Sequence, residues 1–265
     1  MLGCYINLPT GCQIEPPGLL CYSNDAMIFF FYGADTWRSR QKVNEIRDKF
    51  VREVDPTGTN VHVLDGPTLT IERWRNAVVA TGFFATKRLI IVRDPLRLKK
   101  ADVLEQVLAV LDQSSVMADA IIVFWEQGPA DKRTTIYRRL AAEKYTQEYE
   151  PLDDAAAEHW LAKEFAARGG QISREALPLL RSRVGSDLWR ANQEIDKLLA
   201  HCAGRQIEIV DIEQLVTGTY DDLIFQFVDA VAAGNRREAH RLLDSQIKSG
   251  SHELYLLTMI ARQFR

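Results

Sequence analysis

The sequence predicts an α/β domain built on a parallel sheet, followed by regions that are entirely helical. From residue 27 to about residue 150, short apolar runs alternate with segments of helical periodicity. This alternation is typical of strand–helix–strand units joined by right-handed crossovers. After Pro151 the strand-like runs stop and only helical patterns remain. We therefore expect a doubly wound sheet in residues 27–150 and helical bundles after it.

Composition and charge exclude several classes of protein. The 265 residues are 46% hydrophobic and 26% charged, an ordinary balance for a globular protein. No apolar run approaches the roughly 18 residues of a membrane span, so we expect no membrane partner. The net charge of −3 argues against a free-standing nucleic-acid-binding protein, which is usually basic. The cysteines do not form a disulfide framework, which favours a reducing, cytoplasmic setting.

Residues 1–26 do not share the pattern of the rest. They have neither the basic start nor the long apolar centre of a signal peptide. Cys4, Cys12 and Cys21 have spacings that fit no usual zinc site, and no histidine lies near them. We expect no metal here. We expect this segment to be a leader, either non-native or disordered, upstream of a true start at Met27.

A strand, a glycine turn and a helix open the α/β region. The apolar run from Ile28 to Tyr32 predicts a buried strand, Gly33 the turn, and a helical stripe follows in Val43, Ile46, Phe50 and Val54. A phosphate-binding loop would stand at this turn, and it needs a second glycine and a lysine. Gly33 is instead followed by Ala-Asp-Thr-Trp-Arg-Ser-Arg. We therefore expect the scaffold of a nucleotide site with no cofactor in it.

Three more strands are predicted by the apolar runs at residues 61–64, 89–92 and 120–125. Thr68 or Thr70 is expected to cap the helix that leads to Phe83, and a further helix is predicted by Leu104, Val107, Leu108 and Leu111. Glu126 ends the last run, where ATPases of this shape carry ligands for magnesium. A lone glutamate there is usually solvated, so we expect no metal. The basic residues between 131 and 139 favour a solvated helix face, with contact to DNA phosphates as the weaker alternative.

Phe83 and Phe84 stand side by side between small or polar residues, in the connection from a helix to a strand. Adjacent residues lie about 100° apart on a helix, so both rings cannot easily enter one core. Two interpretations follow. Aromatic residues at such a junction usually belong to the core, and the residues alone favour that reading. Alternatively, at least one ring reaches the surface and enters a pocket of a partner.

The helical part is predicted to begin with three helices. Asp153 is expected to cap the first, which has Trp160, Leu161 and Phe165 inward, and Ser173 to cap the second, which Pro178 should kink or shorten. The third is defined by Leu188, Ala191, Ile195, Leu198 and Cys202. A brief helix follows over residues 211–216, and another helical unit starts near Tyr220.

Several of these segments resemble one family. Residues 80–92 read Ala-Thr-Gly-Phe-Phe-Ala-Thr-Lys-Arg-Leu-Ile-Ile-Val and resemble a segment of the delta subunit of the bacterial DNA polymerase III clamp loader. Residues 31–37, Phe-Tyr-Gly-Ala-Asp-Thr-Trp, are similar to that family's opening, which likewise lacks the phosphate loop. Later similarities begin at Val184 and at Phe227, although a glutamine separates Asn192 from Glu194 where the family has none. Together they span about residues 27–265.

The resemblance implies an architecture. It implies an AAA+-like parallel-sheet domain without a P-loop in residues 27–150, and a small helical lid domain in residues 151–218. Residues 219–265 would be the start of a helical collar domain, which we expect to be truncated.

The resemblance also implies a function. It implies a non-catalytic accessory subunit of the DNA polymerase holoenzyme that binds and opens the sliding clamp (the beta subunit) during DNA replication. Phe83 and Phe84, with Thr81 and Gly82, would form the clamp-binding element. The other loader subunits would be bound through the collar, and DNA within the assembled loader.

Two other functions stay open on the residues alone. A nucleotide-binding AAA+-type ATPase would have this fold, but the required lysine and glycine are missing. No local pattern suggests a catalytic triad, although triads are assembled in space. A helical adaptor unrelated to replication is the other alternative. ATP binding would distinguish the first from a clamp-loader subunit, and clamp binding would distinguish the second.

Overall fold

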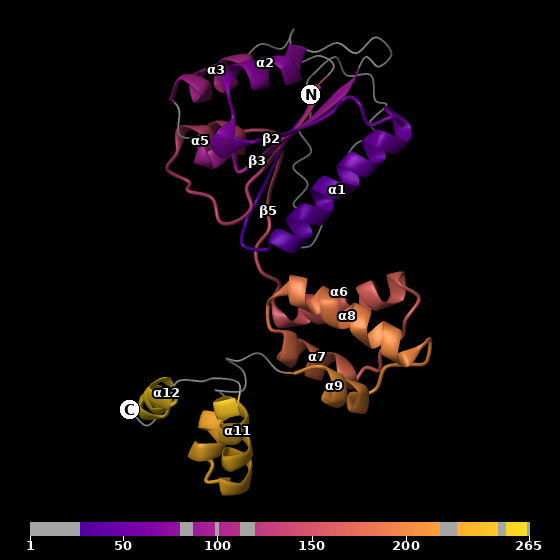
Figure 1. The fold of residues 1–265 in the computed structure, drawn as a ribbon, viewed down its shortest axis with the longest axis vertical. Coiled ribbons are helices and arrows are strands. Elements are labelled where there is room, and N and C mark those ends of the chain that lie inside the picture. Colours follow the sequence, from indigo (N-terminus) through magenta and orange to yellow (C-terminus); the bar gives the residue numbers. More distant parts are fainter. Residues whose placement is uncertain are drawn as a thin grey trace, which may run out of the picture. The chain divides into compact units, whose positions relative to one another are not determined.

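The computed structural model describes residues 27–79, 87–98, 101–111, 120–217, 227–248 and 253–263. The chain divides into two compact units, Met1–Glu150 and Pro151–Arg265, which are described separately (Figure 1). None of the helices in the described ranges is long and apolar enough to cross a membrane.

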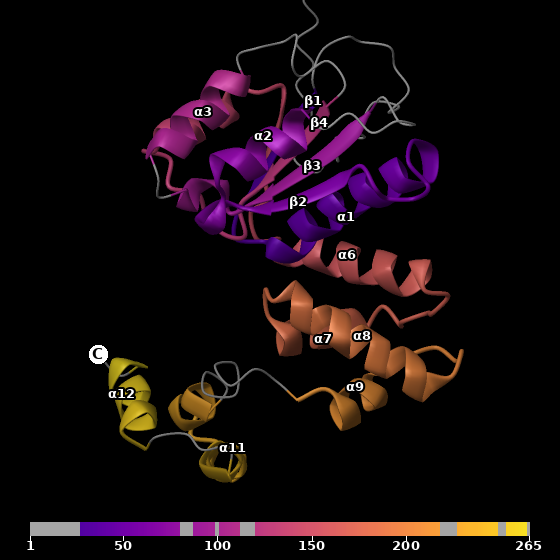
Figure 2. The same ribbon diagram turned by 45° about the horizontal axis from the view of Figure 1, so that its top comes forward.

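The first unit is built on a five-stranded parallel sheet (Figure 2). Its strands are β1 (Met27–Tyr32), β2 (Val61–Asp65), β3 (Arg88–Arg93), β4 (Ala120–Trp125) and β5 (Tyr145–Glu148). They lie in the order β2-β3-β4-β1-β5, so β2 and β5 are the edge strands. The four strands expected from apolar runs are confirmed. The strand β5 was not predicted, because its sequence Tyr-Thr-Gln-Glu has no apolar run.

Helices cover both faces of the sheet, and each face has its own core (Figure 1). The helix α1 (Thr36–Glu53) packs on one face through Val43, Ile46 and Phe50. The helices α2 (Ile71–Val79), α3 (Ala101–Leu111) and α5 (Thr135–Ala141) lie on the other. Short 3-10 turns at Gly66–Thr68 and Pro95–Arg97 follow β2 and β3. Thr70 rather than Thr68 caps α2, since its hydroxyl accepts a hydrogen bond from the Arg73 amide at 3.3 Å.

The second unit begins with four helices that pack on one another: α6 (Asp154–Ala167), α7 (Ala176–Val184), α8 (Leu188–Cys202) and α9 (Ile209–Leu215). The five residues predicted as the inner stripe of the third helix are all buried in α8. Asp153 caps α6 as expected, because its carboxylate accepts a hydrogen bond from the Ala156 amide at 2.8 Å. These helices therefore follow the sequence pattern closely.

The expected cap at Ser173 is wrong. The Ser173 hydroxyl is buried without a hydrogen-bond partner in the described part of the chain, and α7 begins only at Ala176. The Ser173 amide bonds instead to the Ile207 carbonyl at 2.9 Å, next to the bridge between Ile172 and Ile207. Pro178 falls in the first turn of this later helix, where its missing N–H costs nothing.

Further helices complete the second unit: a stretch at 227–232, α11 (Arg236–Lys248) and α12 (Glu253–Gln263). Their apolar cluster is made of Phe227, Val228, Ala230, Leu242 and Leu256. Gly234, at φ +69°, follows the first stretch, where a left-handed residue suits a helix end.

Candidate functional site

The expected clamp-binding residues Thr81, Gly82, Phe83 and Phe84 lie outside the described residues, between α2 and β3. The elements on either side are firmly packed. Trp74 and Val78 of α2 are buried in the core, and so is Leu89 of β3. The described elements on either side of residues 80–86 are therefore anchored in the core of the sheet domain. Both interpretations of the two phenylalanines stay predictions.

The turn after β1, where a phosphate loop would stand, is filled by the chain itself. The Gly33 amide bonds to the Gly128 carbonyl at 2.9 Å, and the Tyr149 amide bonds to the Tyr32 carbonyl at 2.7 Å. Gly33 has φ +130°, and a Cβ built on it would lie 2.2 Å from the Tyr149 carbonyl oxygen. The turn is therefore pressed against the backbone that follows β5.

The N-terminus of α1 carries a carboxylate of its own. Asp35 caps the helix, because one carboxylate oxygen accepts a hydrogen bond from the Arg38 amide at 2.9 Å and the other pairs with the Arg38 guanidinium. Arg38 also donates to the Glu150 carbonyl. A helix N-terminus ordinarily attracts a phosphate through its free amides and dipole. Here Asp35 occupies that position and would repel a second anion.

Glu126, at the carboxyl end of β4, is buried with only 4% of its surface exposed. The expectation that it is solvated is wrong, because the 3-10 turn at Pro95–Arg97 folds against it. Its carboxylate accepts a hydrogen bond from the Leu96 amide at 3.1 Å, and the Arg97 guanidinium lies 3.7 Å away. Burial raises the pKa of Glu126 above its usual range. The side chain thus holds the loops after β3 and β4 together.

Asp94, in the loop after β3, bonds in turn to the loop after β4. Its carboxylate accepts hydrogen bonds from the Gln127 amide at 3.1 Å and from the Gln127 side chain at 2.9 Å. Its own amide donates to the Trp125 carbonyl at 2.8 Å. Within the described ranges, no group of three or more His, Cys, Asp or Glu side chains could hold a metal ion. These carboxylates serve loop-to-loop contacts.

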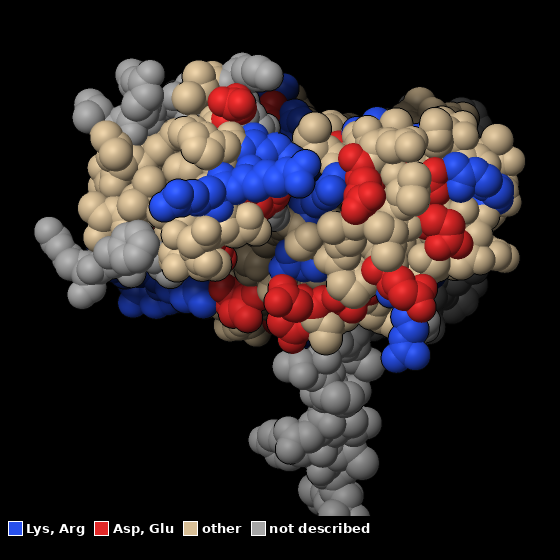
Figure 3. All heavy atoms as spheres, turned by 90° about the horizontal axis from the view of Figure 1, so that it is seen from below, with Lys and Arg blue, Asp and Glu red and all other residues tan. Residues whose placement is uncertain are grey.

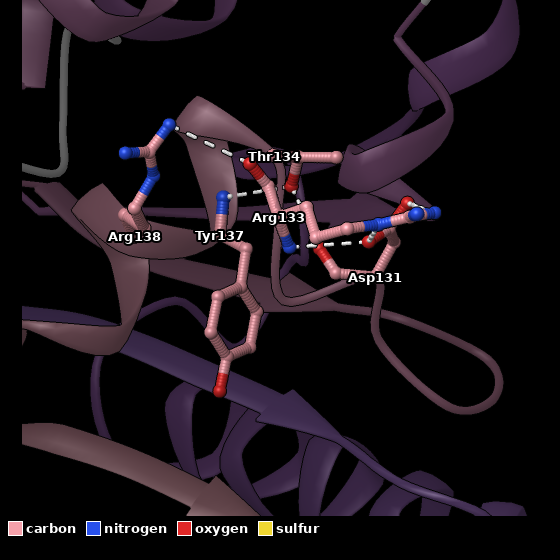
Figure 4. Close-up of polar contacts among 5 residues, drawn as sticks. All are labelled: Asp131, Arg133, Thr134, Tyr137 and Arg138. Atoms are coloured by element: carbon pink, nitrogen blue, oxygen red, sulfur yellow. Dashed lines mark hydrogen bonds and ion pairs between the residues drawn. The ribbon is translucent and has the colours of Figure 1, made fainter.

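The basic residues around α5 pair mainly with the chain's own acids (Figure 4). Asp131 accepts hydrogen bonds from the Arg133 amide and guanidinium at 3.1 and 2.9 Å, while Arg138 donates to the Arg133 carbonyl at 3.5 Å. Lys132 pairs with Glu148 at 3.0 Å. On the face drawn in Figure 3, a band of Lys and Arg side chains lies next to separate clusters of Asp and Glu.

The sequence did not predict the residues, distant along the chain, that pack against the turn after β1. Tyr149 and Glu150 lie more than a hundred residues from Asp35 and Arg38, and nothing local links them. The pairing of Asp35 with Arg38 could have been found, since an acid at the N-cap and a base three residues later are neighbours on a helix.

Comparisons with known proteins point to one family. Residues 29–149 match the family model described as "DNA polymerase III, delta subunit". A probable DNA polymerase III subunit delta from Aquifex aeolicus (strain VF5) is 25% identical over 101 residues. Those residues are 37% of this chain and 29% of that protein, so the match spans less than a third of the relative's length. The resemblance predicted from the sequence is confirmed.

Solved structures share the fold. The Bacillus subtilis DNA clamp loader delta protein (YqeN) is 22% identical, with a TM-score of 0.60, over 90% of this chain and 72% of that one. The Thermotoga maritima RuvB Holliday junction branch migration motor is 14% identical, with a TM-score of 0.51, over 88% of this chain and 80% of that one. The predicted AAA+-like fold is confirmed by these likenesses and by the five-stranded parallel sheet.

Proposed function

We propose that this chain, whose residues 29–149 carry the domain of the DNA polymerase III delta-subunit family, is a clamp-loader subunit that binds the sliding clamp and opens its ring during DNA replication. It would be an accessory subunit of the polymerase holoenzyme, itself non-catalytic and working in the cytoplasm. The observation that carries the proposal is the family match over a domain whose phosphate position is taken by Asp35. A loader subunit without nucleotide chemistry fits both findings.

The proposed clamp contact is Phe83 and Phe84, with Thr81 and Gly82 beside them. The support is the position of these residues between two buried elements, α2 with Trp74 and β3 with Leu89. Small neighbours leave room for aromatic rings to enter a pocket. An aromatic ring at the centre of an interface commonly contributes about 2 kcal/mol or more on truncation to alanine.

Ring opening follows from differential affinity. A bound protein shifts an equilibrium only by as much as it prefers one state over the other. In this proposal the delta-type element binds the altered subunit interface of the clamp more tightly than the closed one. Binding and opening are then two measures of the same contact.

The remaining partners are proposed from the family and the charge. The helices from residue 219 onward would contact the other loader subunits. DNA would be reached within the assembled loader, because a net charge of −3 gives an isolated chain little attraction for phosphates.

The experiment is a binding measurement with a paired stability measurement. The double variant Phe83→Ala/Phe84→Ala should lose clamp affinity on the order of a thousandfold, if two losses of about 2 kcal/mol add. Its melting temperature should stay within a few degrees of the wild-type value. Trp189→Ala, which truncates a partly exposed aromatic residue of α8, is the control and should bind the clamp normally.

Two outcomes would contradict the proposed clamp contact, and a third would contradict the function. If the double variant unfolds, the rings belong to the core, since large-to-small core changes leave cavities. If it folds and binds the clamp as the wild type does, the contact lies elsewhere. Failure of the wild-type chain to bind any sliding clamp would overturn the function itself.

A further inference from the structure

The segment that joins the two units starts at the turn where a phosphate loop would stand. The sheet domain ends at Glu150, and the helical unit begins at Pro151. Arg38, in the first turn of α1, donates a hydrogen bond to the Glu150 carbonyl. A side chain at the phosphate position therefore also binds the last residue of the sheet domain.

Arg38 is itself held in place by its neighbours. Its Nε atom lies 2.5 Å from a carboxylate oxygen of Asp35, and only 4% of the Asp35 side chain is exposed. Its guanidinium carbon lies 5.8 Å from the centroid of the Tyr149 ring, which is within the range of a cation–π contact. A planar guanidinium with several N–H groups can bind a carboxylate and a carbonyl at once. Arg38 is thus positioned to bind Glu150 rather than to move freely in solvent.

The backbone that precedes Glu150 is fixed as well. The Tyr149 amide donates to the Tyr32 carbonyl at 2.7 Å, and the Tyr149 carbonyl accepts a hydrogen bond from the Asp35 amide at 3.0 Å. The Tyr149 ring is buried against Phe31, with 5.9 Å between the ring centroids. The chain is therefore bound to the sheet domain up to and including the Glu150 carbonyl.

The helical unit fixes the chain again from Asp153 onward. The Asp153 carboxylate accepts a hydrogen bond from the Ala156 amide at 2.8 Å, and its carbonyl accepts one from the Ala157 amide at 2.8 Å. Between the two anchored parts lie Pro151 and Leu152. Proline has no N–H, and the Leu152 amide donates no hydrogen bond within the described part of the chain. These two residues are the place where the backbone is least restrained.

We propose that the hinge between the two units is confined to Pro151 and Leu152, and that Arg38 sets its first boundary by holding the Glu150 carbonyl. A hinge is a small number of residues that absorb a change of backbone angles, and the ring of Pro151 already fixes one of these angles. Loss of Arg38 would add Glu150 to the hinge, while the Tyr149 backbone keeps its own two hydrogen bonds. The hinge would exist whether or not the chain binds a clamp.

Distances between one label on each unit test the hinge in the full chain. Spin labels are attached to azide-bearing residues at two exposed positions, Glu105 of α3 and Lys163 of α6, so that the cysteines stay unlabelled. Arg38→Ala should broaden the distribution of distances by roughly 3 Å or more, because each freed residue adds up to about 3.3–3.6 Å of reach. Arg52→Ala, which truncates an exposed arginine of α1, is the control and should leave the width unchanged.

Two further variants test the boundary and the hinge separately. Arg38→Lys keeps the charge, but an ammonium group lacks the fork that binds Asp35 and the Glu150 carbonyl together, so its width should lie between those of the wild type and Arg38→Ala. Leu152→Pro fixes a further backbone angle without removing a hydrogen bond, so it should narrow the distribution. Melting temperatures are recorded for all four variants.

The outcomes separate the two parts of the proposal. A folded Arg38→Ala variant with the wild-type width, or equal broadening by Arg52→Ala, would overturn the role of Arg38. A folded Leu152→Pro variant with the wild-type width would show that the hinge lies elsewhere and would overturn the proposal as a whole. If Arg38→Ala unfolds, Arg38→Lys and Leu152→Pro decide the question.

Discussion

The two ends of the parallel sheet are built in opposite ways. At the carboxyl ends of the strands, each loop is tied to another: Gly33 to Gly128, Asp94 to Gln127, and Glu126 to Leu96. At the amino ends, β2 begins at Val61 beside Leu89 of β3, and β3 follows the proposed clamp contact in the sequence. One end is closed by the chain's own contacts, and the other is the end at which we propose that a partner binds.

The difference is the reason to expect that this AAA+-like fold serves without nucleotide. Ligands of open α/β sheets ordinarily bind outside the carboxyl ends of the strands. In this chain that position is taken by Asp35, Arg38 and the backbone of Tyr149. The contacts at this position join parts of the chain itself and stabilise the domain. Substitutions at the closed end should therefore alter stability, and those at the open end should alter binding.

The largest effect on stability is expected at Gly33. Gly33→Ala places a Cβ 2.2 Å from the Tyr149 carbonyl oxygen at a φ of +130°. We expect a loss of about 3 kcal/mol or more in the free energy of unfolding. Gly58→Ala is the matched control, because Gly58 also has positive φ but nothing within 4 Å of its Cβ position. It should cost only about 1 kcal/mol, measured by urea denaturation. Equal losses in the two variants would show that the turn is not pressed against Tyr149.

An intermediate effect is expected at Glu126. Glu126→Ala leaves the Leu96 amide without its acceptor and should cost about 1–3 kcal/mol at pH 7. Glu126→Gln keeps an acceptor oxygen and removes the buried charge, so it should cost less than the alanine variant. Chemical denaturation of the three proteins in one buffer measures the order, and a glutamine variant less stable than the alanine variant would contradict it.

The pH dependence of the same pair sharpens the assignment. Burial raises the pKa of Glu126, so the folded protein holds this proton more tightly than the unfolded chain, in which the pKa is about 4.3. The stability that this proton contributes is present below the unfolded pKa and lost as the pH rises through the folded one. The wild type should therefore lose stability relative to Glu126→Gln as the pH rises above about 4. A constant difference from pH 4 to pH 7 would mean that the carboxylate is not desolvated.

The smallest effect is expected at Asp35. Asp35→Ala removes the cap of α1 and should cost about 1 kcal/mol. Asp35→Asn keeps a capping oxygen and should cost less, since the partly exposed pair with Arg38 contributes little alone. Neither variant should gain ATP affinity in calorimetry, because the turn still lacks a lysine and remains packed on Tyr149. Micromolar ATP binding by Asp35→Ala would show that the carboxylate alone closes the site.

Elements with strong local patterns could be predicted from the sequence. The strands β1, β3 and β4 are continuous apolar runs, and α8 has an unbroken inner stripe from Leu188 to Cys202. A strand buried on both faces is apolar at every position, and a helix buried on one side repeats apolar residues every three or four positions, so both can be recognised in the sequence. The strand β5 leaves none, because Tyr145–Glu148 is half-buried and becomes a strand by pairing with β1.

The contacts of the closed end could be predicted only in part. Asp35 was recognised as unfavourable for phosphate, since that depends on a local charge. The burial of Glu126 depends on the turn at Pro95–Arg97, thirty residues away. In the second unit, likewise, the failed cap at Ser173 depends on a hydrogen bond to Ile207. Long-range hydrogen bonds of this kind have no periodicity. The proposed contact at Phe83 and Phe84 stays a prediction.

The affinity for the sliding clamp, with and without nucleotide, tests most directly whether one end of the sheet is closed to nucleotide while the other binds the clamp. The wild-type chain is titrated with clamp by calorimetry, once in buffer alone and once in about 1 mM Mg-ATP. That concentration would occupy even a weak nucleotide site with a Kd of roughly 1 mM. The two titrations together report on both ends of the sheet. We expect clamp binding with the same Kd in both buffers, because the nucleotide position is filled and the open end acts alone. A Kd that changes with Mg-ATP, or an absence of clamp binding in both buffers, would contradict the account.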